Sequence, residues 1–155
     1  MATVAVGKKV PAFKAAATGS GSIASKDLLG TPYVLYFYPK DDTPGCTLEG
    51  HDFRDRHHAF KRRKVRIFGV SRDSLASHEK FKAKHGLPFE LLSDPDEALC
   101  QKFDVIKLKN MYGKKVRGIE RSTFLVDAHG VLRNEWRKVK VDGHVDAGLA
   151  AAESL

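Results

Sequence analysis

Apolar and polar positions alternate along the chain in two periods, one typical of strands and one of helices. A continuous apolar run at residues 34–38 predicts a strand that is buried on both faces, and residues 65–71 predict the next strand. Between them, Thr43 offers a helix N-cap, and Pro44 suits the first helical position because its missing N–H has no partner to lose there. A helix should therefore run from this point to about Arg62.

The second half of the chain continues the alternation and ends with a hairpin. Residues 74–85 predict a helix that stops at Gly86, and Asp94 with Glu97 resembles a capping box that opens a short helix to about Phe103. The remaining predicted elements are strands at 122–127 and 131–139, joined by a hairpin turn, and a helix at 144–153. Residues 18–22 are interpreted as a turn. We expect one α/β domain of residues 1–155, with a central mixed sheet and helices on both faces.

Composition narrows the class of protein. The chain has 155 residues, of which 42% are hydrophobic and 30% charged, as in an ordinary globular domain. No apolar run approaches the ~20 residues of a membrane-spanning helix, so no membrane partner is expected. The first nine residues lack a basic start followed by an apolar segment, which predicts a cytoplasmic protein without a secretory signal. The net charge of +8 favours anionic partners without identifying one.

The two cysteines, Cys46 and Cys100, are too few for a disulfide framework and are considered separately. Cys46 falls at the third position of the first predicted helix, where free N–H groups and the helix dipole stabilise a thiolate. Helical spacing places Gly50 and Phe53 on the same face, so the sulfur should lie at the rim of the core. An inert buried cysteine is the alternative. The Thr43 hydroxyl, three residues before the thiol, favours a reactive nucleophile.

Other cysteine chemistries fit less well. A thioredoxin-type dithiol would need a second cysteine at position 49, where the chain has Glu49. A zinc site needs four ligands, and only His51 lies near Cys46 in the sequence. The other histidines are scattered and are expected on the solvated surface: His57, His58, His78, His85, His129 and His144. We therefore predict neither a metal nor a cofactor.

The segment 36–47 closely resembles the peroxiredoxins, in particular the bacterioferritin comigratory protein or peroxiredoxin Q subfamily, through the spacing Pro-x-x-x-Thr-x-x-Cys. Agreement continues through residues 69–73, 92–95 and 118–125, and so covers nearly the whole chain. The resemblance implies a thioredoxin-like fold and reduction of hydrogen peroxide and organic hydroperoxides. It also favours a monomer.

The resemblance assigns roles to four residues of this chain. Cys46 corresponds to the peroxidatic cysteine, Pro39 to the residue that shields it, Thr43 to the hydroxyl that contacts thiolate and peroxide, and Arg121 to the active-site arginine. Physical chemistry supports these roles, because thiolate attack builds negative charge on the departing oxygen and needs fixed donors aimed at it. The guanidinium of Arg121 stays charged at any working pH. The alternative for Arg121 is an exposed charge at a strand edge.

The product of attack is a sulfenic acid on Cys46, which a second thiol must resolve. Many relatives carry a resolving cysteine five residues later, where this chain has His51, and others carry one near the end of the helix predicted at 74–85, where none is present. We therefore expect an external thiol, from thioredoxin or from glutathione and glutaredoxin. Cys100, next to Leu99, is interpreted as a buried residue, and its action as the resolving cysteine is the alternative.

A different class of function, a basic polyanion-binding module, also has some support. Residues 105–118 contain no acid and include Tyr112 for stacking, together with five cations: Lys107, Lys109, Lys114, Lys115 and Arg117. No helix-turn-helix, RNA-recognition or zinc-finger signature accompanies them. We interpret the stretch as a solvated basic loop and expect no nucleic-acid partner.

Overall fold

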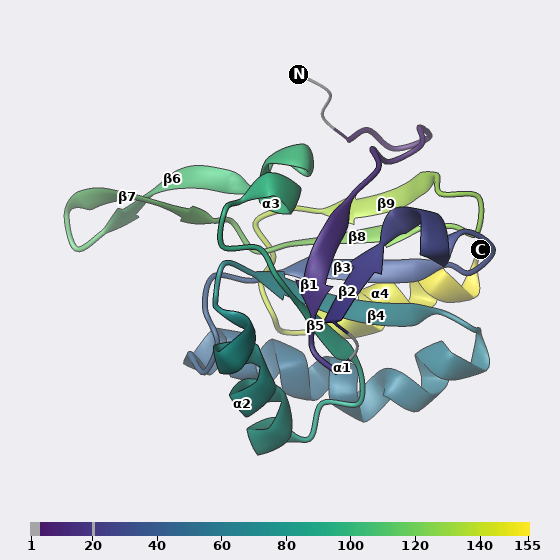
Figure 1. Cartoon of the computed structure of the whole chain (residues 1–155), viewed down its shortest axis with the longest axis horizontal. Coiled ribbons are helices and arrows are strands. Elements are labelled where there is room, and N and C mark those ends of the chain that lie inside the picture. The colour runs from purple at the N-terminus through teal and green to yellow at the C-terminus, as the bar shows by residue number, and fades with distance from the viewer. Residues whose placement is uncertain (1–3, 20) are drawn as a thin grey trace.

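A seven-stranded mixed sheet forms the centre of the structure, a computed structural model that describes residues 4–19 and 21–155 (Figure 1). In spatial order its strands are β2 (Gly21–Ala24), β1 (Lys14–Ala17), β5 (Glu90–Ser93), β4 (Arg66–Ser71), β3 (Tyr33–Phe37), β8 (Ser122–Val126) and β9 (Leu132–Trp136). The three strands β3, β4 and β5 are parallel, and the other pairs are antiparallel. The mixed sheet is confirmed. Of the predicted turn at 18–22, Ser20 lies outside the described residues, as do residues 1–3 of the N-terminal segment.

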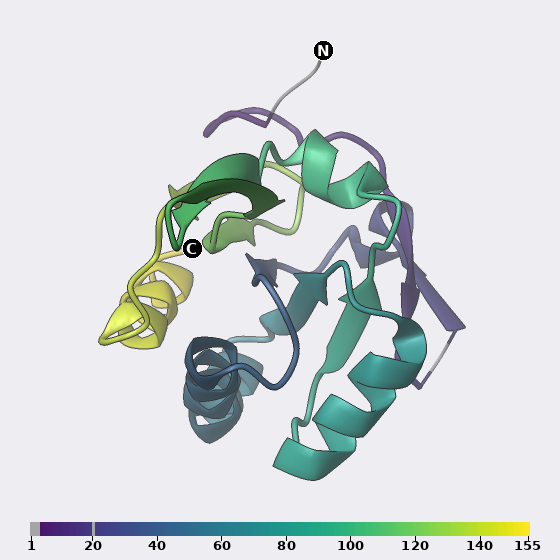
Figure 2. The same ribbon diagram turned by 90° about the vertical axis from the view of Figure 1, so that its left-hand side faces the viewer.

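Helices cover both faces of the sheet, as predicted (Figure 1, Figure 2). One face carries the three longer helices, α1 (Pro44–Arg62), α2 (Leu75–His85) and α4 (His144–Glu153). The other face carries the 3₁₀ helix η1 (Ser25–Leu28) and the short helix α3 (Ala98–Lys102). Within the part of the chain that the structure describes, no helix has both the length and the apolar character needed to cross a bilayer.

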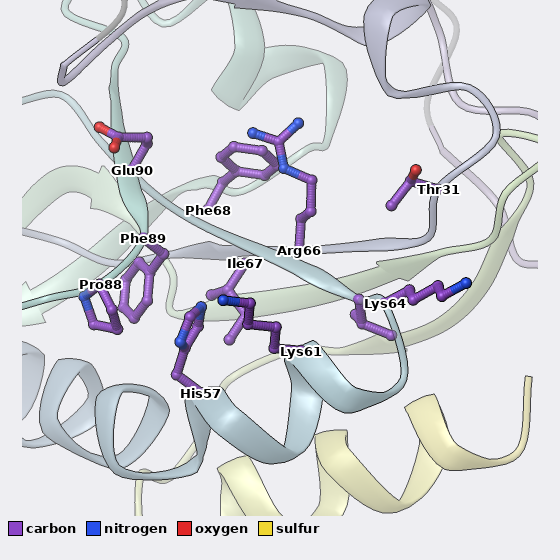
Figure 3. Close-up of a pocket in the computed structure, with 11 residues that line it drawn as sticks. Thr31, His57, Lys61, Lys64, Arg66, Ile67, Phe68, Pro88, Phe89 and Glu90 are labelled. Carbon is purple, nitrogen blue, oxygen red and sulfur yellow. The ribbon is translucent and has the colours of Figure 1, made fainter.

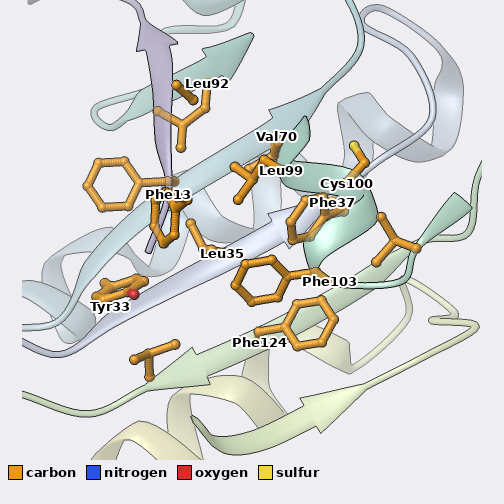
Figure 4. Close-up of a cluster of buried hydrophobic side chains, with 14 of the residues drawn as sticks. Phe13, Tyr33, Leu35, Phe37, Val70, Leu92, Leu99, Cys100, Phe103 and Phe124 are labelled. Atoms are coloured by element: carbon orange, nitrogen blue, oxygen red, sulfur yellow. The ribbon is translucent and has the colours of Figure 1, made fainter. Parts of the chain in front are cut away.

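Strand β3 is buried on both faces, and its alternate residues divide the core into two layers. Phe37 points into the α3 layer, where its ring lies 5.4 Å from that of Phe103 and 5.6 Å from that of Phe124 (Figure 4). Tyr36 points into the α1 layer and stacks on Phe53, with ring centroids 4.4 Å apart. Because of this division, the sheet separates residues of α1 from residues of α3.

Helix α3 begins later than the capping-box pattern predicts. The N–H of Glu97 first donates to the Asp94 carbonyl in a turn, Glu97 adopts a φ of +66°, and the helix begins only at Ala98. Asp94 still serves this helix, because its carboxylate accepts hydrogen bonds from the N–H groups of Leu99 and Cys100, at 3.0 and 2.7 Å. The prediction was wrong about the start of the helix because the chain makes one more turn before entering it.

The basic stretch predicted as a loop is instead a β-hairpin. Strand β6 (Ile106–Met111) pairs with β7 (Lys114–Ile119), and Figure 1 shows the pair projecting from the sheet. Tyr112 occupies the turn with a φ of +53° and is fully exposed. Two apolar side chains, Leu108 and Val116, are also exposed. The hairpin was missed because its apolar alternation is short, covering only Ile106 to Lys109, and most of its side chains are exposed.

Three short strands of the sheet also escaped prediction. Strands β1 and β2 consist of four residues each, mostly Ala, Gly and Ser, which have little strand propensity. Strand β5 has four residues as well, too few to show a period. Strands β1 and β5 pair with each other across a long stretch of sequence, with Ala17 opposite Leu92, and β2 forms the edge of the sheet beside β1.

Candidate active site

Cys46 lies at the edge of the sheet where β3 ends and α1 begins, the place where open α/β sheets bind ligands. Thr43 is the N-cap residue with extended backbone, and Pro44 begins the helix, which puts Cys46 at the third helical position as predicted. The Cys46 side chain is only 2% exposed and shares the α1 layer with Phe53 and Phe60. The thiol therefore occupies the first turn of a helix and is shielded from bulk water.

Arg121 reaches Cys46 from the strand next to β3. Strand β8 pairs antiparallel to β3 with Ser122 opposite Phe37, so the residue just before β8 lies at the same edge as the end of β3. Nη2 of Arg121 donates to Sγ of Cys46 at 3.4 Å, although the two residues are 75 positions apart. The Arg121 side chain is 15% exposed. This contact excludes the alternative of an exposed charge at a strand edge.

Glu49 is the residue of this site that sequence reasoning missed. It lies on the same face of α1 as Cys46, is fully buried, and accepts a hydrogen bond of 2.6 Å from Nη1 of Arg121. Its second carboxylate oxygen has no hydrogen-bond partner among the described residues. Burial raises the pKa of Glu49 to about 7, although Arg121 opposes the rise. The sequence held one signal, an acid three positions after Cys46 on an otherwise apolar helix face.

The charge of Arg121 is secure in this setting. Burial by itself lowers the pKa of the guanidinium, but the negative charges of Glu49 and Cys46 raise it, and the net shift is upward. The fork of donors is thus held between a carboxyl group and the sulfur. Such an arrangement presents a fixed positive charge beside the sulfur of Cys46.

Thr43 and Pro39 lie in the loop that connects β3 to α1. The hydroxyl of Thr43 donates to the carbonyl of Lys40 at 2.9 Å, rather than capping the helix. Pro39 is half-buried and lies two residues after the end of β3, next to Tyr38. The structure thus brings Cys46 and Arg121 into contact and places the other two predicted residues in the loop that leads into the same helix.

Two histidines predicted on the surface are in fact buried. His78 is 0% exposed, and its ring nitrogens face Asp41 and the carbonyl of Leu92. His144 lies 2.8 Å from the hydroxyl of Thr123, and burial lowers the pKa of His144 to about 4. The prediction was wrong because each imidazole finds a polar partner inside the protein, which residue spacing alone does not show.

Asp41, Asp73 and His78 form the group of described residues whose side chains come nearest to a metal-binding arrangement, with ligand atoms within 4.8 Å of one another. Their atoms already have protein partners. Asp73 accepts from the backbone N–H of Asp41 and from the hydroxyl of Ser71, at 2.8 and 2.6 Å. The group is therefore satisfied as a hydrogen-bond network.

A surface cavity of about 480 Å³ lies at the opposite end of the sheet (Figure 3). It is bordered by the end of α1, the start of β4 and the segment before β5, with these side chains among its lining: His57, Lys61, Arg66, Phe68 and Phe89. Cys46 lies in the first turn of α1, whereas this cavity lies where α1 ends. The cavity is therefore separate from the thiol site.

Comparison with known proteins assigns the family. The model of the AhpC/TSA family matches residues 6–135. This chain is a peroxiredoxin of the AhpC/TSA family. It is 60% identical over 121 residues to peroxiredoxin Bcp of Xanthomonas campestris, covering 78% of this chain and 76% of that one. It is 48% identical over 153 residues to peroxiredoxin Bcp of Bacillus subtilis, covering 99% and 98%.

A solved structure supports the same assignment. The bacterioferritin comigratory protein of X. campestris, solved with trapped intermediates and ligands to examine its alkyl peroxide reduction activity, superimposes with a TM-score of 0.87. The two sequences are 52% identical, over 92% of this chain and 90% of that one. The peroxiredoxin resemblance, the thioredoxin-like fold and the thiol peroxidase activity predicted from the sequence are confirmed for this peroxiredoxin.

Proposed function

We propose that Cys46 is the peroxidatic cysteine of this peroxiredoxin and that it reduces hydrogen peroxide and alkyl hydroperoxides. The contact between Arg121 and the Cys46 sulfur carries this proposal. The thiolate attacks one peroxide oxygen, an S–O bond forms and the O–O bond breaks. The departing oxygen takes up a proton and leaves as water or an alcohol, and Cys46 becomes a sulfenic acid.

The neighbouring residues supply the electrostatics of this step. Arg121 stabilises the thiolate and then the negative charge that grows on the departing oxygen. Glu49 orients Arg121 through the second arm of the guanidinium fork. Thr43 uses its proton on the Lys40 carbonyl, so the lone pairs of its hydroxyl oxygen can accept the proton of an incoming hydroperoxide. Pro39 shields the thiol from water.

Resolution of the sulfenic acid requires an external thiol, from thioredoxin or from glutathione and glutaredoxin. Cys100 is fully buried in the α3 layer, whereas Cys46 belongs to the α1 layer on the other face of the sheet. Burial raises the pKa of Cys100, and Asp94 raises it further, so the nucleophilic thiolate is disfavoured. A disulfide needs Cα atoms within roughly 7 Å of each other, and the sheet separates Cys46 from Cys100.

The proposal also includes the setting of this cycle. The enzyme would work as a monomer whose residues 1–155 form one domain, in the cytoplasm, where a reducing environment keeps thiols unpaired. Sedimentation of the reduced protein at micromolar concentration would test the oligomeric state, with a single monomeric species expected.

Stopped-flow consumption of hydrogen peroxide by pre-reduced protein tests the assignment of the nucleophile. Cys46→Ser should abolish consumption, whereas Cys100→Ser should retain most of it, because among the described residues a cationic side chain donates to the sulfur of Cys46 and none to that of Cys100. Far-UV circular dichroism serves as the control for folding. Equal loss in the two folded variants would overturn the assignment.

Steady-state turnover of Cys100→Ser tests the source of the resolving thiol. With thioredoxin, or with glutathione and glutaredoxin, this variant should turn over peroxide at close to the wild-type rate. If it completes one reaction and then stops under conditions in which the wild type continues, Cys100 is the resolving residue and the external-thiol proposal is wrong.

A further inference from the structure

His78, on α2, is a fully buried imidazole with a hydrogen-bond acceptor at each nitrogen. Its Nδ1 lies 2.7 Å from Oδ2 of Asp41, and its Nε2 lies 2.9 Å from the carbonyl oxygen of Leu92. A carbonyl oxygen can only accept, so Nε2 must carry a proton. A neutral imidazole has one N–H, and the Nδ1 contact therefore needs either a second ring proton or a protonated carboxyl group on Asp41.

The surroundings of Asp41 favour its ionised form. Oδ1 accepts from the hydroxyl of Tyr38 at 2.6 Å, and Oδ2 accepts from the hydroxyl of Ser77 at 2.7 Å as well as from His78. Burial acts to raise the pKa of Asp41, but the hydrogen bonds from His78, Tyr38 and Ser77 outweigh it, and the net shift is downward. The contact is therefore best described as an imidazolium paired with a carboxylate, both buried.

This pair joins α2 to the loop that leads to Cys46. Asp41 is the central residue of that loop, and Figure 2 shows the loop extending between α1 and α2 before it enters α1. The N–H of Asp41 donates to Asp73 at 2.8 Å, beside the start of α2. The next residue, Asp42, has a φ of +60° and binds Lys84 at the end of α2, at 2.8 Å. The loop is thus fastened to α2 at two consecutive residues.

We propose that the buried ion pair of His78 and Asp41 holds this loop in the position that the peroxidase reaction needs, which makes both of them positioning residues. The inference rests on the proposed role of Cys46 and extends it. Neither side chain contacts the sulfur; they act through Thr43, two residues after Asp41, whose hydroxyl the peroxide reaction uses. A displacement of about 1 Å at a reacting group can slow a reaction by about 100-fold.

A pair that positions the loop should affect two reactions of Cys46 to different extents, whereas a pair that only stabilises the fold should not. Attack on a peroxide uses the Thr43 hydroxyl, whereas alkylation of Cys46 by iodoacetamide uses only the thiolate, which Arg121 stabilises independently of the loop. Loosening the loop should therefore slow the reaction with hydrogen peroxide much more than it slows alkylation.

Asp41→Asn is the decisive variant, compared with the wild type and with Asp94→Asn, which alters a buried carboxylate in the opposite layer. In stopped-flow experiments at neutral pH, Asp41→Asn should react with hydrogen peroxide at least about 10-fold more slowly, with alkylation changed by less than about 2-fold. Asp94→Asn should change neither rate. A wild-type peroxide rate in Asp41→Asn, equal losses in both reactions, or an equal peroxide loss in Asp94→Asn would overturn the proposal.

Selective ¹⁵N labelling of histidine gives a second, spectroscopic readout. At neutral pH the NMR signals of His78 in the wild type should show both ring nitrogens protonated. In Asp41→Asn, one nitrogen should lose its proton, because an amide cannot balance the buried charge. A singly protonated His78 in the wild-type protein would contradict the ion pair.

If Asp41→Asn fails to fold, Ser77→Ala replaces it, because it removes one of the three side-chain donors to Asp41 from a partly buried position. It should show a smaller loss of the same kind, about 2- to 5-fold and confined to the peroxide reaction. If Ser77→Ala then reacts with hydrogen peroxide at the wild-type rate, the proposal is rejected. A wild-type protein that does not consume peroxide would refute the role of Cys46 instead, so the two failures are distinguishable.

Discussion

Glu49 gives the most quantitative prediction, because it is a carboxyl group buried beside the thiol, and only one of its oxygens has a hydrogen-bond partner in the described part of the chain. Burial raises its pKa from 4.5 to about 7. Between these two values the folded protein binds a proton that the unfolded chain has already released. The free energy of unfolding must therefore fall as the pH rises through this interval, and the full penalty is present above pH 7.

The size of the effect follows from the same pKa values. Each pKa unit corresponds to about 1.4 kcal/mol, so ionising Glu49 inside the folded protein costs on the order of 3 kcal/mol. Replacement by Gln removes the titration and keeps an acceptor for Nη1 of Arg121. The free energy of unfolding of Glu49→Gln minus that of wild type should therefore increase by about 3 kcal/mol as the pH rises from about 4 to about 8.

Urea unfolding of the two proteins at several pH values across this interval measures the difference directly. Subtraction cancels every other titrating group, and Glu79→Gln on the exposed surface of α2 is the matched control, with a curve parallel to that of wild type. If the curves of Glu49→Gln and wild type are parallel as well, the buried carboxyl does not titrate in this range and the reasoning about its environment is wrong.

Three further predictions concern the site and its support. Arg121→Ala should slow the reaction with hydrogen peroxide by about 10²- to 10³-fold in stopped-flow measurements on folded protein, since it removes the principal donor. Thr43→Val should have a loss of similar order in the same assay, whereas Thr43→Ser should be mild because the hydroxyl is kept. Gly69→Ala should lower the free energy of unfolding in urea by about 1–3 kcal/mol, because its Cβ would lie 2.8 Å from Tyr36 and from Leu91.

The parts of the site that follow local rules could be predicted from the sequence. The order of Thr43, Pro44 and Cys46 determines a helix start, since N-cap and first-turn preferences depend on a few neighbouring residues. The long apolar runs predicted the central strands for a similar reason. Arg121 was placed at the site only by family resemblance, because its contact with Cys46 depends on the register between β3 and β8.

Buried polar residues were beyond sequence reasoning. Glutamate is rarely fully buried and histidine is intermediate, and burial of Glu49 and His78 becomes favourable only when a partner from a distant element is in place. For Glu49 that partner is Arg121, and for His78 it is Asp41. The hairpin of β6 and β7 was missed for the opposite reason, because its two strands pair with each other without burying an apolar face.

The central claim is that peroxide oxidises Cys46 to a sulfenic acid, which a thiol from another molecule then resolves. Mass measurement of the reduced protein after one equivalent of hydrogen peroxide tests it most directly, followed by digestion under non-reducing conditions. The account predicts a gain of one oxygen atom, located on the peptide that contains Cys46, with Cys100 unmodified. Oxygen on Cys100, or loss of two hydrogens with a peptide that links Cys46 to Cys100, would contradict it.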